Sequence, residues 1–381
     1  MKKIAIIGAG EFQNPLILKA KEMGYETHVF AWKSGDIGER TADFFYPISI
    51  TEKDEILKLC KTMKPQAVVT IASDLATLTV SYVASGLGLP CNSEQCTACS
   101  TNKYRMRRAF AQAGVKTPGF VLVSPEDDLS VLEGLSFPLI IKPTDRSGSR
   151  GIMKVDSIAQ AEEAIRNAAA YSFEKKAIAE EMITGQEYSC EFVSQNGIHH
   201  FLALTKKDTT GIPHFIETGH TEPSGINIRW QEKIKTQIET ALDALGITTG
   251  ASHTEFRITP EGDAAIIEIG ARMGGDFIGS HLVQLSTGYD FVKMTVEAAA
   301  GIPLSLEKGP HYEAAAVRFL FNKEDVLKKQ IVKERFGDLV LQESPVEEEN
   351  FSATVDSSTR AGSYLMAGKM EDVLKAMELS R

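Results

Sequence analysis

The stretch SHTEFRITPEGDAAIIEIG, residues 252–270, contains two runs of alternating character on either side of a Pro-Glu-Gly-Asp turn. Alternation with a period of two around such a turn predicts an antiparallel β-hairpin. The centre of the turn lies between Glu261 and Gly262, so a symmetric hairpin pairs Glu255 with Glu268. The sequence therefore predicts two carboxylates that face each other on neighbouring strands.

The two faces of this hairpin differ in polarity. The polar face carries His253, Glu255, Arg257, Glu268 and Gly270, and the face predicted to lie in the core carries Phe256, Ile258, Ala265, Ile267 and Ile269. Like charges directly opposite each other destabilise a sheet unless a cation separates them. Two interpretations stay open: a divalent cation such as Mg²⁺ bound by the two carboxylates, or a solvated face that Arg257 neutralises.

The composition of the chain excludes several classes of protein. A length of 381 residues predicts two to three domains at about 150 residues each. The formal net charge of −10 argues against a general nucleic-acid binder, and no apolar run approaches the length of a membrane span. Five cysteines in a chain of this size favour a reducing compartment. Glu11, Gln13 and Asn14 interrupt the apolar start, so we expect a cytoplasmic enzyme without a targeting segment.

Residues 1–90 alternate short β-rich runs with helical patterns, which predicts a parallel sheet with helices on both faces. Gly8-Ala9-Gly10 follows the first strand, as in a dinucleotide-binding fingerprint. However, Gln13 stands at the third glycine position, and no acidic residue ends the second strand. These departures argue against a nicotinamide oxidoreductase, and leave either a structural turn or a small-molecule site at the strand ends.

A glycine-bearing loop, residues 144–151, follows Lys142 at the end of an apolar strand. Backbone N–H groups and polar side chains in such a loop can fold over phosphates, although the loop lacks the Walker A pattern. A plain polar hairpin is the alternative. Further strands, at 177–183, 187–194 and 199–207, have the turn residues of antiparallel pairing, and 228–245 and 370–379 are predicted helices. Glu187 at the start of a strand can offer a carboxylate to ribose hydroxyls.

The cysteines and histidines do not form a convincing metal site. Cys91, Cys96 and Cys99 have a spacing that opens a plant-type iron–sulfur site, but the next cysteine, Cys190, lies within a predicted strand. The histidines lack a ligand pattern such as HExxH. We therefore expect small buried thiols rather than a metal cluster.

The order of these features along the chain resembles the ATP-grasp superfamily of carboxylate–amine ligases. The features are Lys103, Lys142 with its loop, Glu180 to Glu187, and Glu255 and Glu268 with Arg272. The stretches EIGARMGGDFIG, residues 268–279, and ETGHTEPS, residues 217–224, look most like the L-amino-acid ligases, which form dipeptides. The tail SSTRAGSYLMAG, residues 357–368, resembles the C-terminal part of that group and of biotin-carboxylase-like proteins.

The resemblance implies an α/β protein with the ATP-grasp fold, of α+β character in its grasp subdomains. It implies a Rossmann-like pre-ATP-grasp domain over 1–98, an ATP-grasp domain over 99–309 with a flap subdomain at about 118–183, and a C-terminal α/β segment over 310–381. It also implies a homodimer.

Residue roles are carried over by the same resemblance. The implied ATP-binding residues are Lys103, Lys142, Ser147, Gly148, Ser149 and Gly151 around the phosphates, Glu180, Glu181, Met182 and Ile183 around adenine, and Glu187 at the ribose. Glu255 and Glu268 are the implied ligands of Mg²⁺ or Mn²⁺. Lys142 and Arg272 are the implied catalytic residues, and His220, Arg272, Gly274 and Gly275 the implied substrate residues.

The implied activity is an ADP-forming ligation of a small-molecule carboxylate, an amino acid, to an amine. Two alternatives remain: a purine-biosynthesis or carboxylase-type ligase, and a non-catalytic ATP-binding regulatory protein. Gly270 stands where the superfamily commonly has an asparagine that binds a second metal ion. The sequence therefore leaves open whether one or two metal ions bind.

Overall fold

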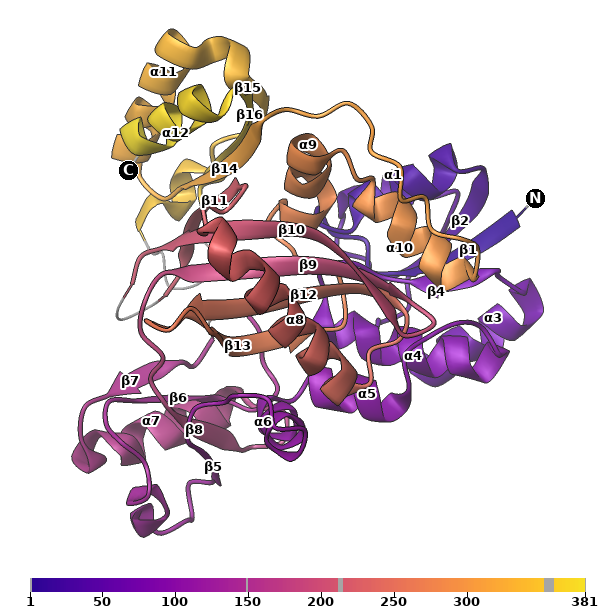
Figure 1. Cartoon of the computed structure of the whole chain (residues 1–381). Coiled ribbons are helices and arrows are strands. Elements are labelled where there is room, and N and C mark those ends of the chain that lie inside the picture. Colours follow the sequence, from indigo (N-terminus) through magenta and orange to yellow (C-terminus); the bar gives the residue numbers. More distant parts are fainter. Residues whose placement is uncertain (1, 149, 212–214, 353–359, 381) are drawn as a thin grey trace.

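The computed structural model describes residues 2–148, 150–211, 215–352 and 360–380. Within these residues the strands form three sheets, two of four strands and one of eight (Figure 1). In Figure 1 the N-terminal part lies at one side of the eight-stranded sheet, and the flap, the four-stranded unit of residues 120–181, lies below it. None of the described helices is long and apolar enough to cross a membrane.

The N-terminal sheet has the strand order β3-β2-β1-β4, and every pair in it is parallel. Its strands are β1 (Lys2–Ile7), β2 (Tyr25–Phe30), β3 (Phe44–Tyr46) and β4 (Ala67–Val69). Its helices are α1 (Asn14–Glu22), α2 (Ile37–Thr41), α3 (Lys53–Met63) and α4 (Asp74–Leu87). The run from Ile4 to Ile7 is fully buried, as expected of a central parallel strand covered on both faces. The parallel sheet predicted for this region is confirmed.

The flap sheet has the order β5-β8-β6-β7, and all its pairs are antiparallel. Helices α5 (Glu94–Ser100) and α6 (Lys103–Gln112) lead into it. Its elements are β5 (Phe120–Val123), β6 (Leu139–Pro143), β7 (Met153–Val155), α7 (Ile158–Tyr171) and β8 (Ala177–Glu181). Alanines on one face of α7 pack with Leu139 and Ile141 of β6, so the flap has a small core of its own.

The central sheet has the order β13-β12-β9-β10-β11-β14-β16-β15, with antiparallel neighbours throughout. Its strands are β9 (Glu187–Gln195), β10 (Ile198–Thr209), β11 (Glu217–Glu222), β12 (Gly250–Ile258), β13 (Ala264–Gly270), β14 (Ala314–Leu320), β15 (Val340–Glu343) and β16 (Gly362–Gly368). The helices are α8 (Ile228–Leu245), α9 (Val283–Thr287), α10 (Phe291–Ala300), α11 (Lys323–Phe336) and α12 (Met370–Leu379). Strands of the C-terminal segment therefore extend the central sheet instead of forming a separate one.

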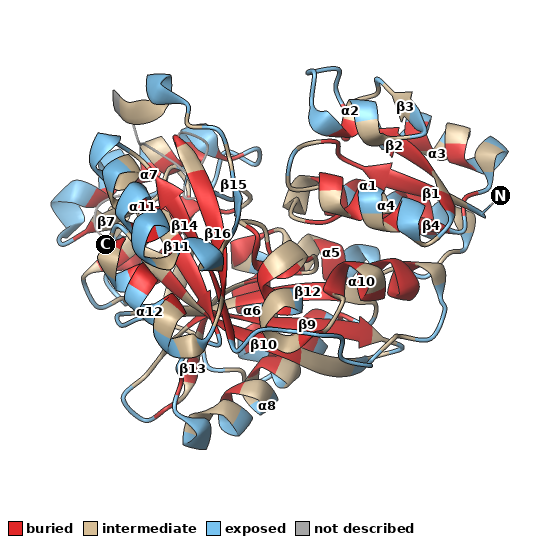
Figure 2. Ribbon diagram, turned by 90° about the horizontal axis from the view of Figure 1, so that it is seen from above, coloured by how far each residue is buried: buried red, intermediate tan, exposed pale blue. Residues whose placement is uncertain are grey.

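Helix α10 joins the N-terminal part to the central sheet. It contacts α1 and β4 on one side, and β9 and β12 on the other. Figure 2 shows that buried residues gather in the strands of the N-terminal sheet and of the central sheet, whereas the outer faces of the helices are exposed. This packing brings the carboxyl ends of the N-terminal strands toward the central sheet.

The β12–β13 hairpin pairs Glu255 with Glu268, as the sequence predicts, but it contains a bulge. The next pair is Phe256 with Ile266, so Ile267 is the extra residue of β13. A bulge reverses the alternation of the strand beyond it. As a result Ile266 is 1% exposed in the core, whereas Ile267 lines a pocket. The prediction that Ala265 and Ile267 face the core is therefore wrong.

Candidate active site

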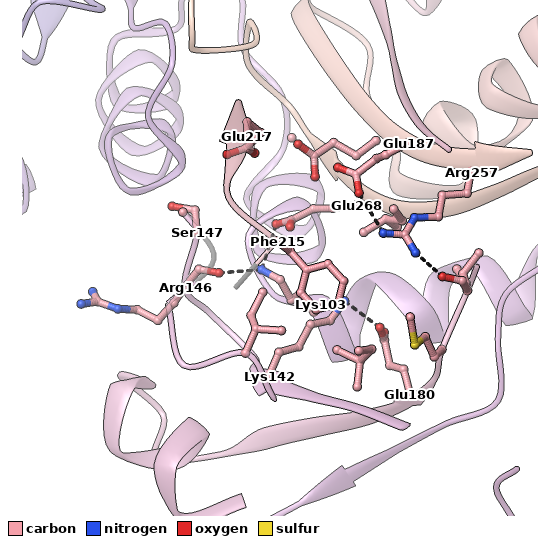
Figure 3. Close-up of a pocket in the computed structure, with 18 of the residues that line it drawn as sticks. Lys103, Lys142, Arg146, Ser147, Glu180, Glu187, Phe215, Glu217, Arg257 and Glu268 are labelled. Carbon is pink, nitrogen blue, oxygen red and sulfur yellow. Dashed lines mark hydrogen bonds and ion pairs between the residues drawn. The ribbon is translucent and has the colours of Figure 1, made fainter. Parts of the chain in front are cut away.

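One pocket between the flap and the central sheet collects most of the residues singled out in the sequence (Figure 3). The singled-out residues that line it are Lys103, Lys142, Ser147, Gly148, Glu180, Glu181, Met182, Ile183, Glu187, Glu255, Glu268 and Arg272. They come from α6, from the flap, and from β9, β12, β13 and the residues after β13. Residues far apart in the chain thus form one charged cavity.

Lys142 is held by a buried ion-pair network. Its Nζ lies 2.6 Å from Glu180 Oε2, and Arg107 Nε lies 2.7 Å from Glu180 Oε1. Burial alone would raise the pKa of Glu180, but Arg107 and Lys142 hold it below its ordinary value. Burial lowers the pKa of Lys142, and Glu180 opposes that effect. The Glu180 carboxylate therefore fixes Lys142 at the wall of the pocket.

Lys103 connects the flap loop to the hairpin. Its Nζ donates to the backbone oxygen of Arg146 at 2.7 Å and to Glu268 Oε1 at 3.0 Å. The lysine lies at the start of α6, where Asn102 caps the helix by accepting from the backbone N–H of Arg105. The helix terminus thus places the ammonium group between the flap loop and a carboxylate, where it can bind phosphate oxygens.

The Glu255–Glu268 pair is neutralised by lysines. Glu255 Oε1 pairs with Lys207 Nζ and lies 3.4 Å from His253 Nε2, whereas Glu268 pairs with Lys103. Burial alone would raise the pKa of Glu255, but Lys207 and His253 hold it well below its ordinary value. The interpretation that Arg257 neutralises this pair is wrong.

Arg257 binds elsewhere in the pocket. Its guanidinium donates to the backbone oxygen of Ile183 and, at 3.2 Å, to Glu187 Oε2. It thereby ties the start of β9 to the strand end that leaves the flap (Figure 3).

The residues implied at adenine lie beside an apolar slot. The Glu181 carboxylate accepts from the backbone N–H groups of Gly119 and Ser136, which ties the end of β8 to two other segments of the chain. The backbone N–H of Met182 donates to Pro138 O at 3.0 Å, which fixes this segment. The apolar side chains that line the pocket here are Ile140, Ile152, Met182, Ile183 and Ile267. Ile267 reaches the slot only because of the bulge in β13.

Lys207 is a residue beside the site that the sequence analysis did not single out. Its side chain is 2% exposed, and its Nζ lies 3.4 Å from Glu187 Oε1, 3.4 Å from Glu217 Oε1, and in contact with Glu255. Burial lowers the pKa of this lysine, but the three carboxylates raise it well above the ordinary value. The only sequence signal that could have pointed to Lys207 is a lysine on the inward-facing side of a predicted strand.

His253 is a second missed residue. Its Nδ1 lies 2.5 Å from Oε1 of the fully buried Glu191, on the neighbouring strand β9. Burial lowers the pKa of His253, but Glu191 raises it to about 9. The ring therefore carries a positive charge behind Glu255. The sequence had placed His253 on the polar face, but no pattern pointed to its partner.

Arg272, an implied substrate residue, lines the pocket and forms a bidentate ion pair with Asp74, the first residue of α4. Gly274 packs against His253, because an added Cβ would lie 2.7 Å from His253 Nδ1. Gly275 lies near Ala72. These contacts bring the N-terminal part to the wall of the pocket.

Three further residues implied at the site are not among the described residues that line the pocket. His220 is fully buried on β11, 3.9 Å from Asp276 and edge-on to Phe319, and it is not part of the pocket wall among the described residues. Gly151, with φ of +68°, packs against Tyr171 and does not line the pocket. Ser149 lies outside the described residues.

Glu255 and Glu268 offer oxygen ligands of the kind that Mg²⁺ prefers. Within the described ranges no group of three or more His, Cys, Asp or Glu side chains is arranged to hold a metal ion. Gly270 contributes no side-chain ligand, although it lines the same pocket. The residues fit an ion that takes two carboxylates from the protein and completes its shell with phosphate oxygens and water.

Comparisons with known sequences identify proteins that are similar to this chain. A family model described as "ATP-grasp domain" matches residues 135–280. The chain is 28% identical over 276 residues to the alanine–anticapsin ligase of Bacillus subtilis (strain 168), covering 64% of this chain and 58% of that protein. It is 30% identical over 173 residues to the D-alanine–D-alanine ligase of Hydrogenovibrio crunogenus, covering 44% and 55%. The chain thus spans less than two thirds of the length of these curated relatives.

Solved structures share the whole fold. The L-amino acid ligase from Bacillus licheniformis superposes with a TM-score of 0.82 at 23% identity, covering 100% of this chain and 97% of that one. The phosphoribosylglycinamide synthetase from Anaerococcus prevotii superposes with a TM-score of 0.77 at 21% identity, covering 99% and 96%. At this identity the superpositions establish the fold alone.

Proposed function

We propose that this chain, which carries an ATP-grasp domain within an ATP-grasp fold, is an ADP-forming ligase that joins the carboxylate of an amino acid to an amine. The observation that carries the proposal is one pocket in which Lys103, Lys142 and Arg272 surround the Glu255–Glu268 pair. This combination of cations and paired carboxylates matches the charge of a nucleoside triphosphate bound with a divalent cation.

The apolar slot supports an adenine nucleotide. Ile140, Met182 and Ile267 offer flat apolar contacts to a base, and Glu187 lies beside the slot with an oxygen acceptor for ribose hydroxyls. Lys103 and Lys142 lie at the phosphate end, beside the flap loop. The pocket thus offers complementary groups to the base, the sugar and the phosphates.

The charges also support the first chemical step. A carboxylate and a triphosphate repel each other, so lysines and an arginine must neutralise their approach. Lys142 and Arg272 are the residues we assign to this task. Mg²⁺, held by Glu255 and Glu268, would add positive charge at the phosphate oxygens. The carboxylate oxygen then attacks the γ-phosphorus, the bond to the β-phosphate oxygen breaks, and an acyl phosphate and ADP result.

The second step joins the amine. The amine nitrogen attacks the acyl carbon, the bond from this carbon to the phosphate oxygen breaks, and inorganic phosphate leaves as the nitrogen loses a proton. An acyl phosphate hydrolyses in water, so the site must exclude solvent. The flap loop at Arg146, Ser147 and Gly148 lines the pocket and is bonded to Lys103, which supports a role in this exclusion.

The amino-acid substrate is supported by the relatives. One curated relative is named as a ligase of alanine and anticapsin, and the other as a ligase of two D-alanines. The five cysteines are free thiols, which supports a cytoplasmic location. The homodimer implied by the sequence remains a prediction, which light scattering of the purified chain would test.

The deciding experiment supplies the purified protein with Mg-ATP, hydroxylamine and each of the twenty amino acids in turn. We expect ADP and a hydroxamate with one or a few acids, because hydroxylamine traps an acyl phosphate. AMP in place of ADP would mean an adenylate and would overturn the mechanism. No hydroxamate with any amino acid, despite ATP binding, would overturn the amino-acid assignment in favour of another carboxylate or of a regulatory protein.

A further inference from the structure

Arg272 is held by a residue from the N-terminal part of the chain, 198 positions away. Its Nε donates to Asp74 Oδ1 at 2.8 Å, and its Nη2 donates to Asp74 Oδ2 at 3.0 Å. Both side chains are 16% exposed. Two parallel hydrogen bonds between a guanidinium and a carboxylate fix the plane of the guanidinium as well as its position.

The backbone beside Asp74 is fixed to the backbone beside Arg272. The N–H of Ala72, a residue with φ of +55°, donates to Met273 O at 3.2 Å. Arg272 Nη1 donates to the same oxygen at 3.3 Å. Ser73 caps α4 by accepting from the N–H of Ala76, so the helix start presents Asp74 toward Arg272. The ion pair is therefore part of a built contact between the two regions.

Gly270 lies against the Asp74–Arg272 ion pair and leaves space for it, because glycine has no side chain. A Cβ at this position would lie 3.1 Å from Arg272 Cζ and Nε, and 3.2 Å from Asp74 Oδ1. These separations are tighter than ordinary van der Waals contacts, so the ion pair would have to shift by a few tenths of an ångström to admit a side chain here. The absence of a side chain at Gly270 and the place of the Asp74–Arg272 pair are thus parts of one arrangement.

We propose that Asp74 is a positioning residue of this site, which holds the Arg272 guanidinium against Gly270 so that its remaining N–H groups serve an anionic ligand in the pocket. Of the five N–H groups of an arginine, the contacts with Asp74 and Met273 O use three. The N-terminal part is then a component of the active site. The ion-pair geometry is independent of the proposed function, and only the role of Arg272 rests on it.

A second reading of Asp74 is direct binding of a substrate ammonium group. Both carboxylate oxygens already accept from Arg272, which favours action through Arg272. The two readings differ in a double-mutant cycle. A residue that acts through Arg272 loses its effect once Arg272 is removed, whereas a residue that touches substrate retains it.

The test compares the wild type, Asp74→Asn, Gly270→Ala, Arg272→Ala and the Asp74→Asn/Arg272→Ala double variant. Asp74→Asn keeps the shape of the side chain, and Gly270→Ala disturbs the same pair without changing any charge. We expect Asp74→Asn to lower kcat by about 100-fold, since misplacement of a reactive group by about 1 Å has effects of this size. Gly270→Ala should lower kcat by a smaller factor, because the pair would only have to shift by a few tenths of an ångström to admit a Cβ. KM for ATP should not change, because the adenine slot and the lysines are untouched. In the Arg272→Ala background, Asp74→Asn should have no further effect.

Wild-type kcat in Asp74→Asn, or an undiminished loss in the Arg272→Ala background, would overturn the proposal. Asp36→Asn, at the start of α2 on the same edge of the N-terminal sheet, is the matched control and should retain full activity. Thermal unfolding separates this proposal from the proposed function. If Asp74 binds Arg272, the unfolding temperature of the double variant should not fall below that of the less stable single variant. This result does not depend on finding a substrate. Additive losses in the unfolding temperature would overturn the ion pair itself.

Discussion

Glu255 and Glu268 lie directly opposite each other on β12 and β13, yet each is paired with a different lysine. Lys207 holds Glu255 from β10, and Lys103 holds Glu268 from the start of α6. The repulsion between the two carboxylates is therefore relieved from two sides. Lys103 also lines the pocket, whereas the side chain of Lys207 is 2% exposed and does not line it.

Replacing Glu268 by glutamine should abolish turnover and leave the fold intact. The substitution removes a charged oxygen ligand and retains the shape of the side chain, so Mn²⁺ binding in the presence of a non-hydrolysable ATP analogue should weaken as well. ADP formation and equilibrium dialysis measure the two effects. Glu261→Gln, in the turn of the same hairpin, is the control. Unchanged ADP formation would contradict the assignment of Glu268 as a ligand of the metal ion.

Replacing Lys207 by methionine should destabilise the protein by about 3 kcal/mol, because loss of one partner leaves buried charges uncompensated. Three carboxylates, at Glu187, Glu217 and Glu255, share this ammonium group. Urea unfolding gives the change in the free energy of unfolding. Lys206→Met is the matched control, because Lys206 is the adjacent residue and is 30% exposed. Equal effects of the two substitutions would contradict the central role of Lys207.

Replacing Glu180 by glutamine should weaken the binding of an ATP analogue by about tenfold or more, because Lys142 loses its charge-assisted anchor. The same change leaves Lys142 and Arg107 as neighbouring buried cations, so the unfolding temperature should fall as well. Calorimetric titration and thermal unfolding measure the two effects. Glu162→Gln, on the exposed face of α7, should leave both quantities unchanged. Wild-type affinity in Glu180→Gln would show that Lys142 needs no anchor.

Glu222 should make the stability of the protein fall as pH rises toward 8. Burial raises its pKa from 4.5 to about 8, while Thr205 and Ser286 donate hydrogen bonds to its carboxyl group. Below pH 4.5 both the folded and unfolded states hold the proton. Between 4.5 and 8 the unfolded state alone releases it, so stability decreases over this window and then levels off.

Glutamine at position 222 cannot ionise, so Glu222→Gln should remove this decline. The gain at pH 7 relative to the wild type should be on the order of 3 kcal/mol. Unfolding curves from pH 5 to pH 8.5 measure it, with Glu232→Gln, an exposed position, as the control. Parallel pH profiles for the wild type and Glu222→Gln would mean that Glu222 is ionised in the folded protein.

Local patterns were sufficient for the elements of the fold. The helix predicted over 228–245 coincides with α8, and the final helix over 370–379 coincides with α12, because both have a clear amphipathic period. The Glu255–Glu268 pairing was also predictable, since a short turn fixes the register of the residues beside it. The order of lysines, glycines and glutamates along the chain carried the resemblance to the ATP-grasp superfamily. The ATP-grasp domain model matches residues 135–280, and the superpositions confirm the fold.

Other parts of the site depend on contacts that no local pattern encodes. Ile267 enters the apolar slot through a bulge, and an alternating sequence does not reveal where one extra residue is accommodated. In the sequence Lys207 is one more charged residue on a predicted strand. Only the folded sheet surrounds it with the carboxylates of β9, β11 and β12. Asp74 lies 198 positions from its arginine.

The sequence by itself thus determined the element types, the antiparallel pairing of the central carboxylates and the kinds of groups that the site offers, because these follow from periodicity, turn chemistry and residue order. Only the tertiary structure decided which cation neutralises which carboxylate, which residue fixes Arg272, and that Gly270 lies against the Asp74–Arg272 pair. Those relationships arise where the N-terminal part, the flap and the central sheet meet. Ion pairs and close contacts between distant segments depend on distances that exist only after the three have packed together.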